Sequence, residues 1–196
     1  MLFNDEFKAS VKKRTHYDWN NESVFDQLPM NTIKRFTWAE ALELLDTHPE
    51  EYRSINKDKL RFVLTKIEAR ERHPNFSKFV RRELDKTFPK NQTTVHIFGG
   101  ITNKCKSFEI HRDVMDVLYL QVFGSVTLSL WKPKLGFIPT SDEIEEKNVD
   151  CYYRKHFKEG RMIWIPRGTW HYIEPHQSRI GFSFGVEGKP EPSTYI

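Results

Sequence analysis

The chain has 196 residues, a net charge of +4 at neutral pH and an aromatic content of 14%. That length is enough for one domain with a hydrophobic core and too short for two domains of ordinary size. Two cysteines in no close pair argue against a disulfide framework and a cysteine-based zinc site. The N-terminal residues lack an apolar signal segment, and no apolar run is long enough to cross a membrane. We therefore expect a soluble, cytoplasmic protein in a reducing compartment.

Residues 61–90 contain most of the excess positive charge. This stretch has nine Lys or Arg against four acidic residues, a local excess of +5. Such an excess is typical of a solvated helix face. It could also form a docking surface for an acidic partner or substrate.

The first half of the chain has helical spacing. Thr37 and Glu40 fit a capping box, and apolar residues from Trp38 onward follow at one-turn intervals. The same spacing predicts helices near 56–70 and 75–87, and Pro74 and Pro89 limit the second of these. A short strand is expected before them, at 32–36.

The second half changes to short runs of β-branched and aromatic residues divided by turn residues. We predict strands at 93–98, 106–111, 117–123, 126–131, 161–166, 170–175 and 179–186. With the strand at 32–36 they make about eight, the number in a double-sheet jelly roll. Helices that precede the strands argue against a doubly wound sheet. The predicted class is α+β, one domain over 1–196. It has a helical lead-in at 1–92, a cupin-like jelly-roll barrel (double-stranded β-helix) at 93–187 and a tail at 188–196.

An insertion at 133–158 separates two of the predicted strands and contains four acids close together. Loops of this length in a compact domain are often lids or binding loops. The insertion is expected either to shape the substrate entrance or to be a plain surface excursion.

His111, Asp113 and His171 are the candidate metal ligands and catalytic centre. Residues i and i+2 of an extended segment point to one face, so His111 and Asp113 can reach the same ion. His171 follows a Pro-Arg-Gly turn that would deliver it at the start of a strand. Two His and one carboxylate form the facial triad of non-heme iron(II) oxygenases, which leaves positions open for a co-substrate and dioxygen. Asp116 should point to the opposite face and is not counted as a ligand.

The spacing of Gly160, Pro166, Gly168 and His171 matches the second cupin motif. The first cupin motif is not matched, because Asp113 replaces its second His. Val117 also stands where that motif has a Glu. This pattern argues against a three-His, one-Glu cupin.

Residues 93–187 resemble the Jumonji C, or cupin-like, family of iron(II)- and 2-oxoglutarate-dependent oxygenases. The segments that resemble it are HRDVMDVLYLQVFGSVTLSLW, with the H-x-D element and Gln-x-x-Gly, and GRMIWIPRGTWHYIEP, with the distal His. The resemblance implies a jelly-roll core with iron(II) on His111, Asp113 and His171. It also implies 2-oxoglutarate and dioxygen as co-substrates and hydroxylation of an unactivated C–H bond. Short stand-alone members are the most similar.

One departure from the family concerns the cation that binds 2-oxoglutarate. Val126 stands where several protein hydroxylases of the family place a Lys or Arg. A buried dicarboxylate needs a cation, and Arg179, with Ser183 nearby on the same strand, is the best substitute. Tyr119 and Thr127 could add hydrogen bonds, and Lys132 is a weaker cationic candidate.

The sequence therefore favours a dioxygenase that hydroxylates a protein, a peptide or a small molecule. The retained Asp113 disfavours a halogenase. Two alternatives stay open: a metal-dependent cupin enzyme that does not use 2-oxoglutarate, and a non-catalytic cupin-like module that binds an acidic partner through residues 61–90.

Overall fold

The computed structural model describes residues 2–19, 23–29, 36–47, 53–58, 61–64, 74–105, 108–133 and 149–188. The helices are α1 (Asp5–Lys12), α2 (Val24–Gln27), α3 (Trp38–Thr47) and α4 (Asn75–Thr87). The strands are β1 (Tyr17–Asp18), β2 (Arg53–Asn56), β3 (Arg61–Leu64), β4 (Gln92–Gly100), β5 (Asp116–Phe123), β6 (Val126–Pro133), β7 (Val149–Phe157), β8 (Met162–Ile165), β9 (Trp170–Pro175) and β10 (Arg179–Glu187). In this part of the chain no helix is both long and apolar enough to cross a membrane.

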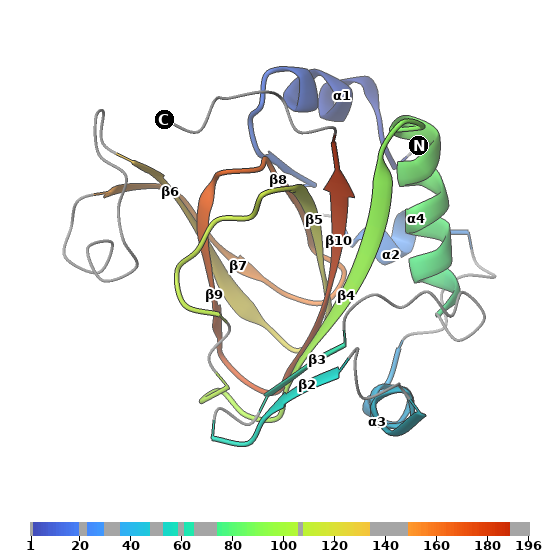
Figure 1. Ribbon diagram of the computed structural model, residues 1–196, viewed down its shortest axis with the longest axis vertical. Helices are drawn as coiled ribbons and strands as arrows, with labels where there is room; N and C mark the ends of the chain where they lie inside the picture. The colour runs from blue at the N-terminus through green and yellow to red at the C-terminus, as the bar shows by residue number, and fades with distance from the viewer. Residues whose placement is uncertain are drawn as a thin grey trace.

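Two antiparallel sheets face each other (Figure 1). The larger has the strand order β1-β8-β5-β10-β4-β3-β2, and the smaller has the order β7-β6-β9. The chain alternates between them. After β4 in the large sheet, an isolated bridge from His111 to His171 joins the small one. Then β5 returns to the large sheet, β6 and β7 lie in the small sheet, and β8, β9 and β10 alternate again.

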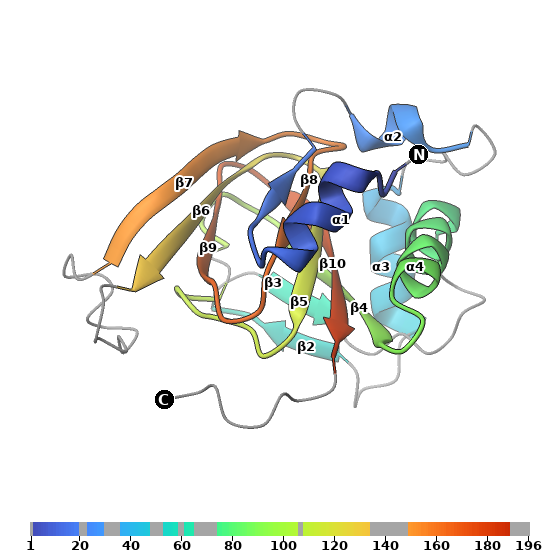
Figure 2. The ribbon, with the colours of Figure 1, turned by 90° about the horizontal axis from the view of Figure 1, so that it is seen from above.

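The centre of the large sheet is buried on both faces, so β5 is apolar along almost its whole length. On one face, residues such as Leu118 and Phe182 pack against the helices. Figure 2 shows α3 and α4 beside this face, on the side away from β6, β7 and β9. On the other face, residues such as Val117 and Ile163 pack between the sheets against Leu128 of β6. Burying each side chain of this size stabilises the fold by about 1.5–3 kcal/mol.

Two helices form where the sequence predicts them. The capping box is confirmed at the start of α3: the backbone N–H of Thr37 donates to Glu40 Oε2 at 2.8 Å, and the Glu40 N–H donates to Thr37 Oγ1 at 3.3 Å. Helix α4 covers Asn75–Thr87 and begins directly after Pro74, as predicted for 75–87. Most of the expected strand at 32–36 lies outside the described residues, and its last residue, Phe36, is buried without belonging to a strand.

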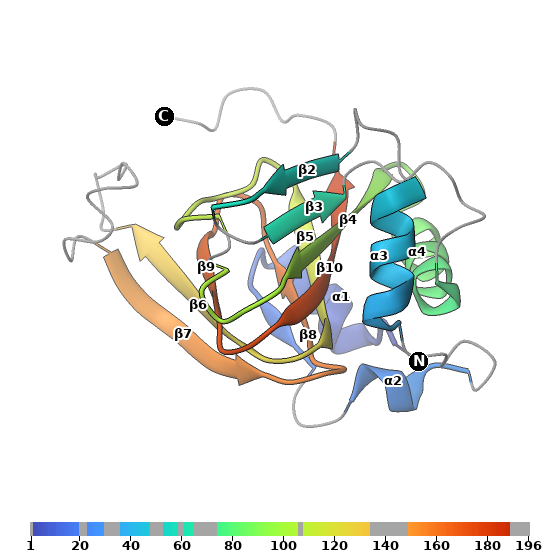
Figure 3. The ribbon, with the colours of Figure 1, turned by 90° about the horizontal axis from the view of Figure 1, so that it is seen from below.

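The predicted helix at 56–70 is wrong in its described part. Residues 53–56 and 61–64 form the antiparallel pair β2 and β3, which extends the large sheet beyond β4, as Figure 3 shows. The spacing of Leu60, Val63 and Leu64 fits a helix, but Phe62 and Val63 are both buried on neighbouring positions, as a two-sided strand requires. Pairing with the edge of β4 overrides the local helical spacing. The described part of the lead-in before β4 therefore contributes three strands to the sheet, where one early strand was expected.

The boundaries of two other predicted segments also change. Residues 106–107 of the strand expected at 106–111 lie outside the described part, and residues 108–111 form only the single bridge at His111. The insertion expected at 133–158 ends in a regular strand, β7, whose residues pair with β6. Tyr153 and Phe157 of β7 are buried between the sheets. This part of the insertion is core and cannot be a detachable entrance loop; residues 134–148 lie outside the described part.

The basic stretch at 61–90 does not form one helix face. Arg61 lies on β3, whereas the later basic residues that the structure describes lie on or beside α4. On α4, Arg81 lies 3.9 Å from Asp85, and Lys86 lies 2.6 Å from Glu83. Binding of an acidic partner to this stretch stays a prediction.

Candidate metal centre and its pocket

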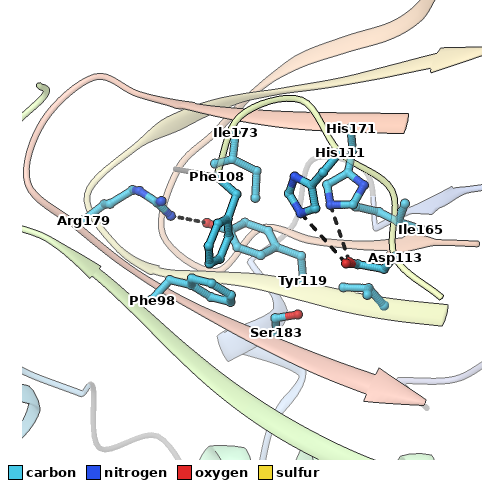
Figure 4. Close-up of a pocket in the computed structure, with 11 residues that line it drawn as sticks. Phe98, Phe108, His111, Asp113, Tyr119, Ile165, His171, Ile173, Arg179 and Ser183 are labelled. Carbon is cyan, nitrogen blue, oxygen red and sulfur yellow. Dashed lines mark hydrogen bonds and ion pairs between the residues drawn. The ribbon is translucent and has the colours of Figure 1, made fainter. Parts of the chain in front are cut away.

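The structure brings His111, Asp113 and His171 together, with one possible ligand atom from each, all within 4.8 Å of one another. Nε2 of His111 lies 3.9 Å from Asp113 Oδ1, and Nε2 of His171 lies 3.6 Å from Asp113 Oδ2. The two imidazole centroids are 4.3 Å apart. Figure 4 shows both rings directed toward the Asp113 carboxylate.

Backbone hydrogen bonds hold the two segments that contain these residues. The His111 N–H donates to the His171 carbonyl at 3.2 Å, and the His171 N–H donates back at 2.8 Å. The Gly168 N–H donates to the Asp113 carbonyl at 2.9 Å. Gly168 has a φ of +76°, which a residue with a side chain rarely adopts, so the turn before His171 requires glycine. The three side chains are therefore placed by the main chain.

The ring orientation of each histidine is set by a carbonyl. Nδ1 of His111 lies 2.7 Å from the Glu109 carbonyl, and Nδ1 of His171 lies 3.0 Å from the Thr169 carbonyl. A carbonyl can only accept, so each Nδ1 is the protonated donor. In the neutral ring Nε2 is then the unprotonated nitrogen, with its lone pair free for a metal.

Burial first, and then the positive charge that His111 can carry, lower the pKa of His171 to about 4, against smaller opposing effects of Asp113 and the Thr169 carbonyl. His171 is only 5% exposed, so desolvation disfavours its cationic form. At neutral pH it is uncharged, the form that binds a metal ion.

A pocket of about 380 Å³, partly open to solvent, contains these three residues. Its remaining lining is mostly apolar: Phe98, Phe108, Val117, Tyr119, Ile165, Ile173, Arg179 and Ser183. Figure 4 shows Arg179 and the metal-ligand candidates at opposite ends, with Tyr119 and Phe108 between them.

Arg179 is the feature of this pocket that most needs a physical explanation. It is 3% exposed, and its Nε atom is buried without a hydrogen-bond partner in the described part of the chain. Within the described residues, its hydrogen bond runs from Nη1 to the Tyr119 hydroxyl at 3.5 Å. No carboxylate of the described residues forms an ion pair with it. A buried and incompletely bonded guanidinium is costly, which indicates an anionic group that binds there.

A chain of hydrogen bonds through Tyr119 and Gln121 supports Arg179. The Tyr119 hydroxyl donates to Gln121 Oε1 at 2.5 Å, and Gln121 Nε2 donates to the Phe123 carbonyl at 2.7 Å. Burial raises the pKa of Tyr119, an effect that Arg179 partly offsets, so the hydroxyl stays protonated. Because its proton goes to Gln121, the Tyr119 oxygen is left to accept from Arg179.

The alternation predicted along β10 is seen in the structure: Arg179 and Ser183 both line the pocket. Gly181 lies between them, and a Cβ atom there would be 2.5 Å from the Tyr119 hydroxyl. Only glycine lets β10 approach Tyr119 this closely.

Two predicted co-substrate residues lie elsewhere. The Thr127 hydroxyl is 2.7 Å from Nε2 of His176, and Lys132 stacks over the Tyr152 ring at 4.9 Å. Neither lines the pocket. Sequence reasoning missed the pocket role of Phe98, Phe108, Ile165 and Ile173. Of these, Ile165 and Ile173 lie on predicted strands next to the second cupin-like motif, whereas Phe108 lies in the expected strand at 106–111 but outside any regular strand of the structure.

Fold and site together define a double-sheet β protein with a candidate two-histidine, one-carboxylate metal centre. Residues 75–192 match the family model of the JmjC domain. The chain therefore belongs to the JmjC-domain family.

Solved structures of the Escherichia coli ribosomal oxygenase YcfD are similar to this chain. One superposes with a TM-score of 0.50 and 15% identity, covering 68% of this chain and 32% of YcfD. YcfD with cobalt and 2-oxoglutarate gives the same values, and YcfD with cobalt and succinic acid differs only in its 16% identity. This likeness shows a shared fold, and the chain spans about a third of the length of YcfD. No curated protein matches the chain.

Proposed function

We propose that this chain is an iron(II)- and 2-oxoglutarate-dependent oxygenase that hydroxylates an unactivated C–H bond. Iron(II) would bind to His111, Asp113 and His171, and 2-oxoglutarate to Arg179 with help from Ser183. Membership of the JmjC-domain family supports the activity. The observation that carries the proposal is the buried Arg179, incompletely hydrogen-bonded and located in the same pocket as the three candidate ligands.

The proposal includes a double-stranded β-helix as the core, in one domain over 1–196. Its eight segments would be β4, the stretch ending at the His111 bridge, β5, β6, β7, β8, β9 and β10. The alternation of these segments between the two sheets supports this description. The small sheet would then run from the His111 stretch through β9 and β6 to β7.

The donor set fits iron(II). Two imidazole nitrogens and one carboxylate oxygen are the ligands of non-heme iron oxygenases, and they leave coordination positions for a co-substrate and dioxygen. Val117 lines the pocket where a four-ligand cupin would have its Glu, so a fourth protein ligand is missing there. When bound, iron(II) would supply dioxygen activation, coupled to oxidative decarboxylation of 2-oxoglutarate.

The pocket also fits 2-oxoglutarate. The Arg179 guanidinium offers planar donors suited to a carboxylate, including the unpaired Nε. Tyr119 and Gln121 fix the direction of this guanidinium. The aromatic and branched side chains around them exclude water, which strengthens the ionic contact.

The substrate of the proposed reaction is a protein, a peptide or a small molecule. A protein is favoured by analogy, because the similar E. coli structures are described as those of a ribosomal oxygenase. The pocket itself offers few polar groups beyond those assigned to metal and co-substrate. Recognition of polar parts of a substrate would therefore occur outside it.

Succinate release from 2-oxoglutarate in the presence of iron(II) and oxygen tests this proposal. The wild-type protein should release succinate, and Arg179→Ala should release far less at the same 2-oxoglutarate concentration. Thr127→Ala is the matched control, because its hydroxyl lies outside the pocket. Tight iron binding without any succinate release would instead favour a cupin enzyme that does not use 2-oxoglutarate. Absence of iron binding would favour a non-catalytic module.

A further inference from the structure

The turn that precedes His171 is tied to the H-x-D segment at two adjacent positions. Its Arg167 N–H donates to Oδ1 of Asp116 at 2.8 Å, and the next N–H, that of Gly168, donates to the Asp113 carbonyl at 2.9 Å. These bonds join residues 113–116 to residues 167–168. The bridge between His111 and His171, two of the candidate ligands, joins the same two segments.

Asp116 provides the only one of these four bonds that depends on a side chain. The other three are made between backbone groups, which no substitution of an ordinary residue would remove. Asp116 is also the first residue of β5, where Val186 of β10 pairs with it. Its carboxylate therefore connects the large sheet to the turn that places a ligand from the small sheet.

The position of Asp116 excludes a direct role as a ligand. The candidate metal cluster consists of His111, Asp113 and His171, and Asp116 does not belong to it. Its carboxylate is half-buried, and burial raises its pKa, which the Arg167 N–H and the charge of Arg167 partly offset. A carboxylate kept in such a place without a ligand role needs another reason.

We propose that Asp116 is a positioning residue that fixes the distance between His171 and Asp113 and so sets the metal affinity of the site. This inference rests on the proposed function only in assuming that the triad binds a divalent metal ion. Of the two bonds that join the turn to residues 113–116, loss of the Asp116 bond would leave that of the Gly168 N–H. Partners that orient metal ligands typically contribute ten- to a hundredfold to metal affinity.

The test compares Mn(II) binding by calorimetry and amide hydrogen exchange of residues 166–171 in four proteins. These are the wild type, Asp116→Ala, Asp116→Asn and Glu159→Ala. Asn keeps an acceptor oxygen for the Arg167 N–H but removes the charge. Glu159 is the matched control: its Oε1 accepts the Gly124 N–H at 3.3 Å, in a turn that contains no candidate ligand.

We expect Asp116→Ala to weaken Mn(II) binding by about tenfold or more and to speed exchange of the Arg167 amide without metal. Asp116→Asn should restore most of both. Glu159→Ala should leave both unchanged, even if it lowers the melting temperature.

Wild-type Mn(II) affinity and exchange in Asp116→Ala would overturn the inference while the proposed function stands. So would an Asn variant that binds Mn(II) as weakly as the Ala variant. If Asp116→Ala does not fold, an Asn variant that binds Mn(II) about tenfold or more weakly than the wild type would overturn it. A wild-type protein that binds no Mn(II) would overturn the proposed function itself.

Discussion

The two ends of the pocket are built in different ways. At the metal end, main-chain groups of the protein satisfy both His111 Nδ1 and His171 Nδ1. At the other end, Arg179 is held by a side-chain network and keeps a buried Nε without a partner. The first end is oriented before anything binds, whereas the second is left incomplete. This difference indicates that backbone geometry mainly sets the end with the candidate metal ligands, whereas the Arg179 end keeps a donor for the proposed co-substrate.

The largest effect should come from the metal end. His171→Ala should reduce Mn(II) affinity by more than a hundredfold and abolish succinate release, because two ligands hold an ion poorly. The fold should persist, since the strands are stabilised by packing on both faces of the large sheet. Calorimetry measures the Mn(II) affinity, and circular dichroism shows whether the fold persists. Near-full activity of this variant with iron would remove His171 from the site.

The second-largest effect is expected for Arg179→Ala. Loss of a buried, charge-assisted pair typically costs about 2–5 kcal/mol in binding. The apparent Michaelis constant for 2-oxoglutarate should therefore rise at least about thirtyfold. Mn(II) affinity should change little. Unchanged 2-oxoglutarate dependence would show that another group anchors the co-substrate.

A companion variant sharpens the comparison. Arg179→Met removes an unpaired buried charge but keeps most of the volume, so the ligand-free protein should melt at the same or a higher temperature. 2-oxoglutarate should stabilise the Mn(II)-loaded wild type and leave Arg179→Met unaffected. A large drop in the ligand-free melting temperature would mean that the guanidinium is already satisfied within the protein.

The pH dependence of stability reports on the metal end. His171 has a folded pKa of about 4 against an ordinary 6.5. As pH falls below 6.5, the unfolded chain takes up a proton there that the folded chain does not. The contribution to stability is therefore complete above pH 6.5 and is lost between 6.5 and 4, by at most about 1.4 kcal/mol per pH unit. Urea unfolding of the metal-free protein measures it. Between pH 6.5 and 4, the free energy of unfolding of His171→Ala should change less steeply with pH than that of the wild type. Equal slopes would contradict this account.

Tyr119→Phe should have a smaller effect on the Arg179 end. It removes the acceptor for Arg179 Nη1 and the donor to Gln121 Oε1. Leaving the buried Gln121 oxygen without a donor should cost about 1–3 kcal/mol of folding stability. Binding of 2-oxoglutarate should weaken by about three- to tenfold, less than in Arg179→Ala. An effect as large as that of Arg179→Ala would indicate that Tyr119 itself contacts the co-substrate.

The smallest effect is expected for Thr127→Ala and Lys132→Ala, whose side chains do not line the pocket. The apparent 2-oxoglutarate constant should stay within about twofold of the wild type. Kinetics of succinate release at varied 2-oxoglutarate concentrations measure this constant. A larger change in either variant would show that its side chain takes part in binding 2-oxoglutarate.

Features set by local spacing could be predicted from the sequence. The H-x-D spacing anticipated that His111 and Asp113 share a face, and the alternation along β10 did the same for Arg179 and Ser183. The same rule could have excluded Thr127, since Val126, Leu128 and Leu130 on its strand are all buried between the sheets.

Features that depend on distant pairing could not be predicted. By strict alternation, Lys132 would point to the same face of β6 as Leu128 and Leu130. A register shift between Leu130 and Trp131 breaks that alternation. Likewise, β2 and β3 form because the edge of β4 is there to pair with. The sequence also could not predict that Arg179 Nε has no hydrogen-bond partner among the described residues, because this depends on side chains that meet only in the folded chain.

The central claim is that 2-oxoglutarate and iron(II) meet in this pocket. Anaerobic titration of the iron(II)-loaded protein with 2-oxoglutarate, followed by visible absorption, tests it most directly. Chelation of iron(II) by the 2-oxo acid produces a charge-transfer absorption, which should rise and saturate in the wild type. A protein that binds iron(II) but shows no such absorption at any 2-oxoglutarate concentration would contradict the claim.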